Sequence, residues 1–304
     1  MSTSGPPEAV REPPEPPRTG PDGLPVPAPR LDHGGPGPSP PDEPSASPAP
    51  SSTSAGAPRP AFAFRPPATA PVQPHRWGLG AYLLAEAVFL CTNVLLVLPF
   101  YLPDGNGRPP AEILLLGLIL PSSLAACVAA LATKLRGNGP GIDLGLKFER
   151  SDLMRGLAFG CGGLLLTIPA AALWSQAVGA QAANSAVGEL FVGQRLALPL
   201  AIAVFLVVWL IAPVCEEILY RGLLWGAVRR HGADRWWAFG LTTLSFALAH
   251  FEFTRTPLLL VIAVPIGLAR LYTGRLGASI IAHQVNNLLP ALSLFFLLTG
   301  VLKG

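Results

Sequence analysis

Five polar side chains lie inside apolar stretches of the C-terminal half of the chain. They fall in three separate segments and are Glu216, Glu217, His250, His283 and Asn287. A carboxylate and an imidazole that hold one water form a general base. A second imidazole and a carboxamide can donate hydrogen bonds to a developing oxyanion. The residue types therefore predict hydrolysis by an activated water.

The spacing of these residues indicates how they can meet. Glu217 and Arg221 are four apart and share a helix face, where an ion pair can form. Glu216 lies about 100° around the same helix, so the two carboxylates can have different roles. His283 and Asn287 are also four apart, so both can face one pocket.

Two further features of the set bear on its chemistry. Phe246 precedes His250 by one turn and could supply an apolar wall to the site. Glu216, His250 and His283 are also residue types that bind zinc with a position left open for water. A zinc ion is therefore a candidate cofactor, and a metal-free water mechanism is the alternative.

Each residue also has a structural explanation. Glu217 and Arg221 could form an ion pair that only stabilises the helix, and a histidine or asparagine could only hydrogen-bond a neighbouring helix. Ionisable groups are costly and rare within membrane spans, however. Their joint occurrence favours a functional site over packing alone.

Long apolar runs provide the elements that would position this set. A span of about 30 Å of hydrocarbon needs roughly 20 apolar residues. Helices are expected, because open strands leave backbone groups unsatisfied in lipid. The predicted spans are 79–101, 112–133, 153–174, 197–218, 236–254, 257–273 and 277–300. The fourth is expected to continue as a helix toward Arg229. The fold class predicted is all-α, a polytopic bundle of seven to eight transmembrane spans.

Composition divides the chain into two parts. Residues 1–76 hold 23 of the 35 prolines, and such a segment is expected to be a disordered, cytoplasmic tail. It could offer proline-rich ligands to an SH3-like partner. Residues 77–304 are the predicted transmembrane domain, and the overall mean hydropathy of +0.46 excludes an ordinary soluble enzyme.

Charge bounds the partners and the orientation. The formal charge is +3 and no Lys/Arg cluster suits a nucleic acid, so the lipid bilayer is the expected partner. Lys and Arg gather in the second, fourth and sixth loops, whereas the first, third and fifth hold one arginine each. By the positive-inside rule we expect the N-terminus in the cytoplasm of a multi-pass plasma-membrane protein.

Three motifs occur in order within residues 212–288. They are EExxxR from Glu216 to Arg221, FxxxH from Phe246 to His250 and HxxxN from His283 to Asn287. This pattern resembles the CPBP (CAAX protease and bacteriocin-processing) family of intramembrane proteases, also called the Abi family. The resemblance covers roughly residues 140–300.

The resemblance implies a catalytic cavity within the membrane, open toward the cytosol, and a membrane-associated or C-terminal peptide as substrate. It implies that Glu216 and His250 activate the water, while His283 and Asn287 stabilise the oxyanion. Glu217 and Arg221 would support the site, and the family's label of metalloprotease adds to the case for zinc. Two other functions stay open: an inactive member that acts as a membrane scaffold or chaperone, and an ion- or proton-coupled transporter.

Overall fold

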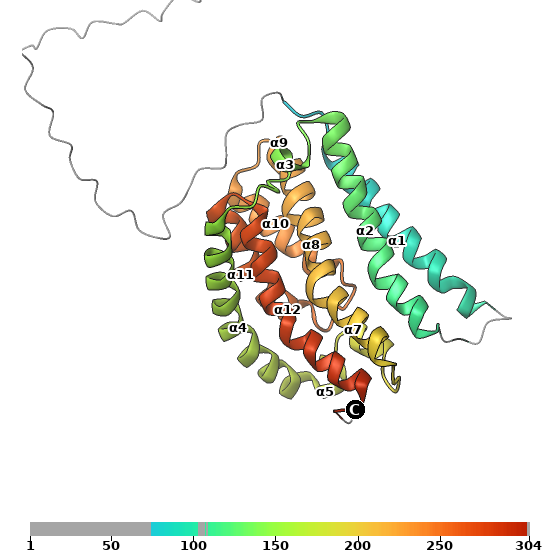
Figure 1. Ribbon diagram of the computed structural model, residues 1–304. Helices are drawn as coiled ribbons and strands as arrows, with labels where there is room; N and C mark the ends of the chain where they lie inside the picture. Colours follow the sequence, from blue (N-terminus) through green and yellow to red (C-terminus); the bar gives the residue numbers. More distant parts are fainter. Residues whose placement is uncertain (1–73, 103–106, 108, 303–304) are drawn as a thin grey trace, which may run out of the picture. The chain divides into compact units, whose positions relative to one another are not determined.

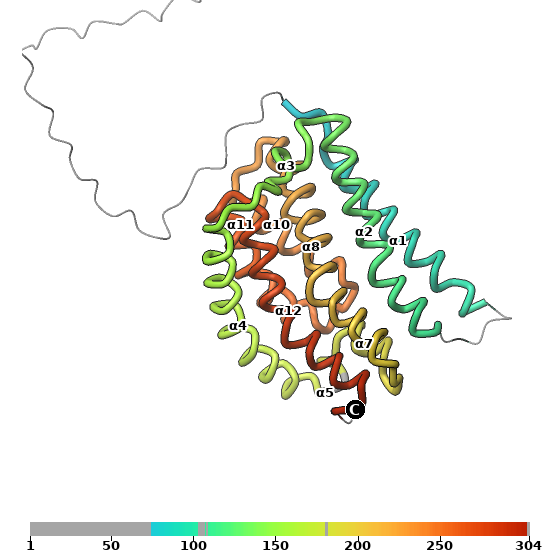
Figure 2. The backbone as a smooth tube through the Cα atoms, viewed as in Figure 1, coloured from blue at the N-terminus to red at the C-terminus, as the bar shows by residue number. Residues whose placement is uncertain are grey.

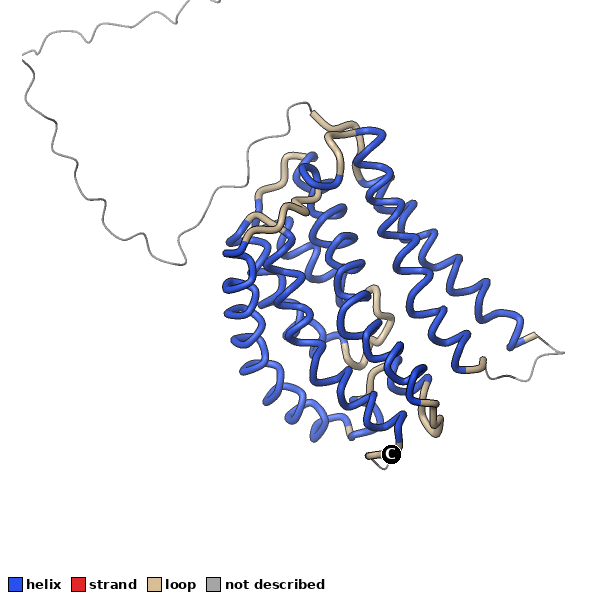
Figure 3. The backbone as a smooth tube through the Cα atoms, in the orientation of Figure 1, coloured by secondary structure: helices blue, strands red, loops and turns tan. Residues whose placement is uncertain are grey.

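The computed structural model describes residues 74–102, 107 and 109–302, and within them every regular element is a helix (Figure 3). The elements are α1 Leu79–Tyr101, α2 Ala111–Arg136, α3 Pro140–Asp143, α4 Arg150–Val178, α5 Ala180–Ala183, α6 Ala186–Leu190, α7 Leu198–Leu206, η1 Val207–Ile211, α8 Ala212–Glu217, η2 Ile218–Leu224, α9 Trp225–Arg230, α10 Arg235–Leu248, α11 Thr256–Thr273 and α12 Leu276–Thr299. The all-α prediction is confirmed for these residues.

Six helical segments of the described chain are long and apolar enough to cross a membrane. They are Leu79–Tyr101, Ala111–Arg136, Arg150–Val178, Leu198–Arg230, Thr256–Thr273 and Leu276–Thr299. At 1.5 Å per residue, even the 18-residue α11 is about 27 Å long. The chain is therefore an integral, multi-pass membrane protein.

The fifth predicted span is shorter than expected. α10 has 14 residues, about 21 Å, and ends at Leu248 rather than at 254. Glu252 and Arg255 follow directly, and Pro257 begins the return through α11. The pair of Glu252 and Arg255 ends the apolar run within one turn of His250. The prediction of seven spans did not take this pair into account.

The fourth span is one continuous helical path from α7 to α9, as predicted (Figure 2). The span also contains two π-helical turns, η1 and η2, which were not predicted. Pro213 follows η1 by two residues and has no N–H to donate, which favours a local change in hydrogen-bond pattern. Glu216 and Glu217 lie between the two π turns.

The loops rich in Lys and Arg are tied together at one end of the helices. Trp77 donates from Nε1 to Asp143 Oδ2 over 2.7 Å, and its carbonyl accepts from Arg230 Nη1 over 2.5 Å. Arg275, between α11 and α12, bonds Asp152 Oδ1 at the start of α4 over 2.6 Å. These contacts agree with the prediction that the second, fourth and sixth loops share one side of the membrane.

Residues 1–73 of the predicted proline-rich tail lie outside the described residues. Its last residues, 74–76, already belong to the folded part: the Arg76 N–H donates to the Arg136 carbonyl over 2.6 Å. Trp77 is 1% exposed and fills the space above Gly226, where a Cβ would lie 2.3 Å from the indole.

α4 and α12 lie side by side because α4 presents small residues to α12 (Figure 1). A Cβ on Gly156 would lie 2.5 Å from Ile281 Cβ, and one on Gly160 would lie 2.7 Å from Val285 Cβ. Without a hydrophobic driving force between helices in lipid, such close backbone approach is a main source of association. Gly156 and Gly160, the glycine stripe of α4, thereby fix the position of α12, the helix that carries His283.

We expect Gly156→Ala to lower the free energy of unfolding by about 1–3 kcal/mol, because the added methyl meets Ile281 and the Ala278 carbonyl. Gly162→Ala is the matched control: it lies on the same helix with nothing within 4 Å of its added Cβ. Unfolding titrations in mixed micelles measure both. Equal stability of the two variants would contradict a packing role for the stripe.

Candidate active site

A fully buried ion pair lies at the centre of the site. Glu217 Oε1 is 2.9 Å from Arg221 Nη1, and both side chains are 0% exposed. The same oxygen is 3.0 Å from Nδ1 of His283 on α12. The predicted i,i+4 pair is therefore present, and it also holds the histidine of another helix. An ionised carboxylate only accepts hydrogen bonds, so Nδ1 of His283 carries the hydrogen.

Glu216 faces a different environment from its neighbour. Its side chain is 28% exposed, whereas that of Glu217 is 0% exposed. Glu216 Oε2 lies 3.6 Å from Nε2 of His283, beyond hydrogen-bond range but close enough for an ion pair. The His283 ring thus lies between two carboxylates, one buried in an ion pair and one accessible.

The Phe246 ring joins the motifs of three helical segments. Its centroid is 4.7 Å from that of His250 and 5.5 Å from that of His283. The Arg221 guanidinium lies 4.4 Å over the same ring. Tyr220 adds an edge contact at 5.5 Å. Phe246 is 2% exposed, so it forms the apolar wall expected from the sequence.

His250 lies just beyond the C-terminal end of α10. Its Nδ1 is 2.8 Å from the Phe246 carbonyl, one of the carbonyls that the end of a helix leaves without a backbone partner. A carbonyl only accepts, so Nδ1 carries the hydrogen and the lone pair of the neutral ring is on Nε2. Nε2 is the atom that a general base needs free.

Asn287 contacts the widened part of the fourth span. Its Nδ2 donates to the Val208 carbonyl in η1 over 3.2 Å. Ala212 N–H bonds the Val207 carbonyl five residues back, so the next donor in this pattern would be Pro213, which has none. Asn287 supplies that hydrogen bond and keeps a second amide hydrogen available.

The neighbouring Asn286 has a different role. Its Nδ2 donates to the carbonyls of Gly160 and Ala282, and its Oδ1 accepts from Thr167 over 3.3 Å. These contacts connect α12 to α4, which is the helix–helix hydrogen bonding considered for the asparagines. Within the described residues, Asn287 hydrogen-bonds the helix that carries Glu216, whereas the hydrogen bonds of Asn286 go to α4 and to α12 itself.

The zinc hypothesis rests on Glu216, His250 and His283. Within the part of the chain that the structure describes, no three His, Cys, Asp or Glu side chains gather closely enough to hold a metal ion. Nδ1 of each histidine is bonded to a carbonyl or carboxylate oxygen, which is also usual for a metal-ligating histidine and leaves Nε2 as the candidate donor. The spacing of the donors, rather than their hydrogen bonds, does not fit a zinc centre, and no step is derived through a metal.

Glu86 is a polar residue that the sequence motifs do not include. It lies in the first span, near the hydroxyls of Tyr82 and Tyr220, and its Oε1 is buried with no hydrogen-bond partner among the described residues. The two tyrosine rings meet edge to face at 6.3 Å. A carboxylate inside an apolar helix is the signal that would have identified it.

Comparison with known families matches one model to this part of the chain. The model is described as type II CAAX prenyl endopeptidase Rce1-like, and it matches residues 198–289. That range begins at α7 and contains all three motifs. Residues 198–289 are an Rce1-like domain of the CPBP family. The Rce1-like domain thus includes the buried ion pair, both histidines and Asn287, as the resemblance predicted.

α1, α2 and α4 lie outside the range of the Rce1-like match. Comparisons with curated proteins and with solved structures find no match. The contacts of α4 with α12, and of Tyr82 with Tyr220, show that these helices nevertheless pack against the Rce1-like domain.

The buried pair can be tested by a double-mutant cycle. Glu217→Gln or Arg221→Met alone is expected to cost about 3–5 kcal/mol of unfolding free energy, because each leaves one uncompensated buried charge. The double variant removes both charges, so its loss of unfolding free energy should be smaller than the sum of the two single losses. Unfolding titrations of all four proteins measure the coupling. Additive losses would show that the two charges do not stabilise each other.

Proposed function

We propose that the protein is an intramembrane endopeptidase that hydrolyses a peptide bond with a water activated by Glu216 and His250. The observation that carries this proposal is the contrast between the adjacent carboxylates. Oε1 of Glu217 contacts both Arg221 and His283 in the buried interior, whereas Glu216 stays accessible beside His283. A purely structural pair would not need the second carboxylate.

In the proposed reaction, Glu216 takes one proton from a water that also donates a hydrogen bond to Nε2 of His250, and the water oxygen attacks the scissile carbonyl carbon. The free amide hydrogen of Asn287 and the Nε2 hydrogen of a His283 ring that is protonated on both nitrogens stabilise the negative oxygen. The carbonyl then re-forms, the C–N bond breaks, and Glu216 passes its proton to the leaving amine. Glu217 and Arg221 keep the His283 ring in orientation throughout.

The family match supports a peptide substrate with a C-terminal CAAX sequence. The first assay therefore uses the full-length protein in lipid nanodiscs with peptides that end in Cys-aliphatic-aliphatic-Xaa, with and without a prenyl group on the cysteine. Mass spectrometry of the released C-terminal tripeptide detects cleavage. The prenylated and unmodified peptides separate recognition of the lipid from recognition of the sequence.

We expect Glu216→Gln to reduce cleavage by a factor of about 10²–10⁴, because the amide cannot take a proton from water. Glu112→Gln is the matched control, since Glu112 is an exposed carboxylate at the start of α2. Both variants should keep the unfolding midpoint of the wild type. Undiminished cleavage by Glu216→Gln would exclude this residue as the base, whereas absence of cleavage by the wild type would favour the scaffold.

Cleavage is expected to survive removal of divalent metals, because the candidate ligands do not converge in the described structure. The measurement is the cleavage rate before and after dialysis against a strong chelator, with elemental analysis of the purified protein. Loss of activity that stoichiometric zinc restores would establish the metal-assisted mechanism instead. Loss of zinc from the Glu216→Gln protein would then identify Glu216 as a ligand.

A further inference from the structure

The position of His250 depends on a loop rather than on a helix. α10 ends at Leu248, and residues 249–255, the His250 loop, lead to the start of α11 at Thr256. Phe251, the next residue along, has a φ of 54°, a left-handed conformation that costs free energy in a residue with a Cβ. Such a conformation persists only where surrounding contacts hold it.

Glu252 makes the contacts that hold the His250 loop. Its Oε1 accepts a hydrogen bond of 2.9 Å from the Ala186 N–H, and its Oε2 forms an ion pair with Arg255. Its carbonyl accepts from the Arg255 N–H over 2.8 Å and from the Thr256 hydroxyl over 3.1 Å. The Glu252 side chain is 13% exposed, although its hydrogen bond with the Ala186 N–H lies at the surface.

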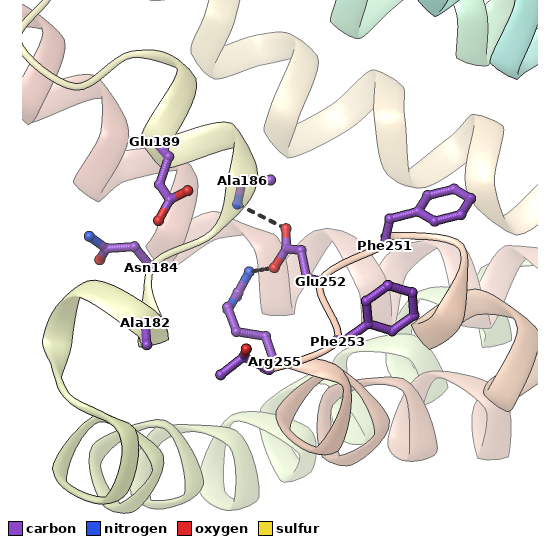
Figure 4. A pocket seen from close by; sticks show the side chains of 9 residues that line it. Ala182, Asn184, Ala186, Glu189, Phe251, Glu252, Phe253 and Arg255 are labelled. Atoms are coloured by element: carbon purple, nitrogen blue, oxygen red, sulfur yellow. Dashed lines mark hydrogen bonds and ion pairs between the residues drawn. The ribbon is translucent and has the colours of Figure 1, made fainter.

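The partner of Glu252 belongs to the connection between α4 and α7, residues 179–197. Ala186 is the first residue of α6, where the backbone N–H has no partner within the helix. Figure 4 shows Glu252 between Ala186 and Arg255, with Glu189 and Asn184 across a cavity of about 410 Å³. One carboxylate therefore links the His250 loop to a segment 66 positions earlier in the chain.

We propose that Glu252 is a positioning residue for His250, which acts by tying the His250 loop to residues 179–197 through the Ala186 N–H. The Phe246 carbonyl fixes the imidazole at one end, and the Glu252 tether fixes the backbone two residues beyond it. Without the tether the loop is free to leave the strained conformation at Phe251, and Nε2 turns away from the water. The proposal rests on the proposed function for the catalytic role of His250.

The backbone of α6 offers a selective variant. Ala186→Pro removes the N–H that Glu252 accepts and leaves every side chain of the His250 loop unchanged. Proline is favoured at the first position of a helix, and the preceding Ser185 has the φ of −79° and ψ of 148° that proline requires of its neighbour. Ala186→Ser keeps the N–H and is the matched control.

A second pair of variants tests the carboxylate itself. Glu252→Ala removes both side-chain contacts of Glu252. Glu189→Ala is its control, because Glu189 lines the same cavity and is exposed. If Glu252→Ala fails to fold because it leaves Arg255 buried and unpaired, Ala186→Pro alone decides the question.

The readout is the ¹⁵N spectrum of histidine-labelled full-length protein in nanodiscs, with the His250 signals identified by their loss in His250→Gln. The chain has 5 histidines, so the spectrum is sparse. We expect a single ring state with hydrogen on Nδ1 in the wild type and both controls. Ala186→Pro and Glu252→Ala should show averaged or broadened His250 signals, while His283 keeps its own.

Cleavage kinetics give the second readout. Ala186→Pro is expected to lower kcat about tenfold or more with KM within about twofold, since misplacing a catalytic group by about 1 Å costs up to 10²-fold. If even the wild type cleaves no peptide, the proposed function fails, but the spectra still test the tether. His250 signals and kcat in Ala186→Pro and Glu252→Ala that equal those of the controls would overturn the proposal.

Discussion

The buried contact of Glu217 with Arg221 and His283 is the constraint on which the rest of the site depends. Charged groups that are buried away from water need close partners of opposite charge or hydrogen bonds. Here Oε1 of Glu217 contacts both the Arg221 guanidinium and the His283 imidazole. The pair therefore fixes the distance between the fourth span and α12. Glu216, one residue earlier and about 100° around the helix, is left in an accessible position.

Much of this arrangement could be predicted from residue types and spacing. The i,i+4 relation of Glu217 and Arg221 predicted the ion pair, and the apolar runs predicted all six candidate spans and the continuation of the fourth helix. These features depend on local periodicity, which sequence reveals. The approach of Phe246 to both histidines also followed from motifs that occur together in one family.

Other features depend on contacts between distant segments and left no local signal. The loop that follows α10 contains Glu252, whose carboxylate accepts from a backbone N–H 66 positions earlier in the chain. The different roles of Asn286 and Asn287 follow from which helix lies on each side of α12. The residue types of Asn286 and Asn287 are identical, so no local pattern distinguishes them. Their side chains differ only by a rotation of about 100° around α12.

The π turns of the fourth span give a consequence for how the helix can vary. A π turn holds more residues per turn than an α-helix, so η1 and η2 act as local insertions within a helix of unchanged direction. A single-residue deletion in η1 would remove this insertion, restore ordinary winding and leave the facing of Glu216 unchanged. The same deletion in the α-helical turns between Leu198 and Glu216 would rotate Glu216 by about 100° toward another neighbour. A change of residue count is therefore tolerated at the π turns, whereas the site fixes the count in the rest of this segment.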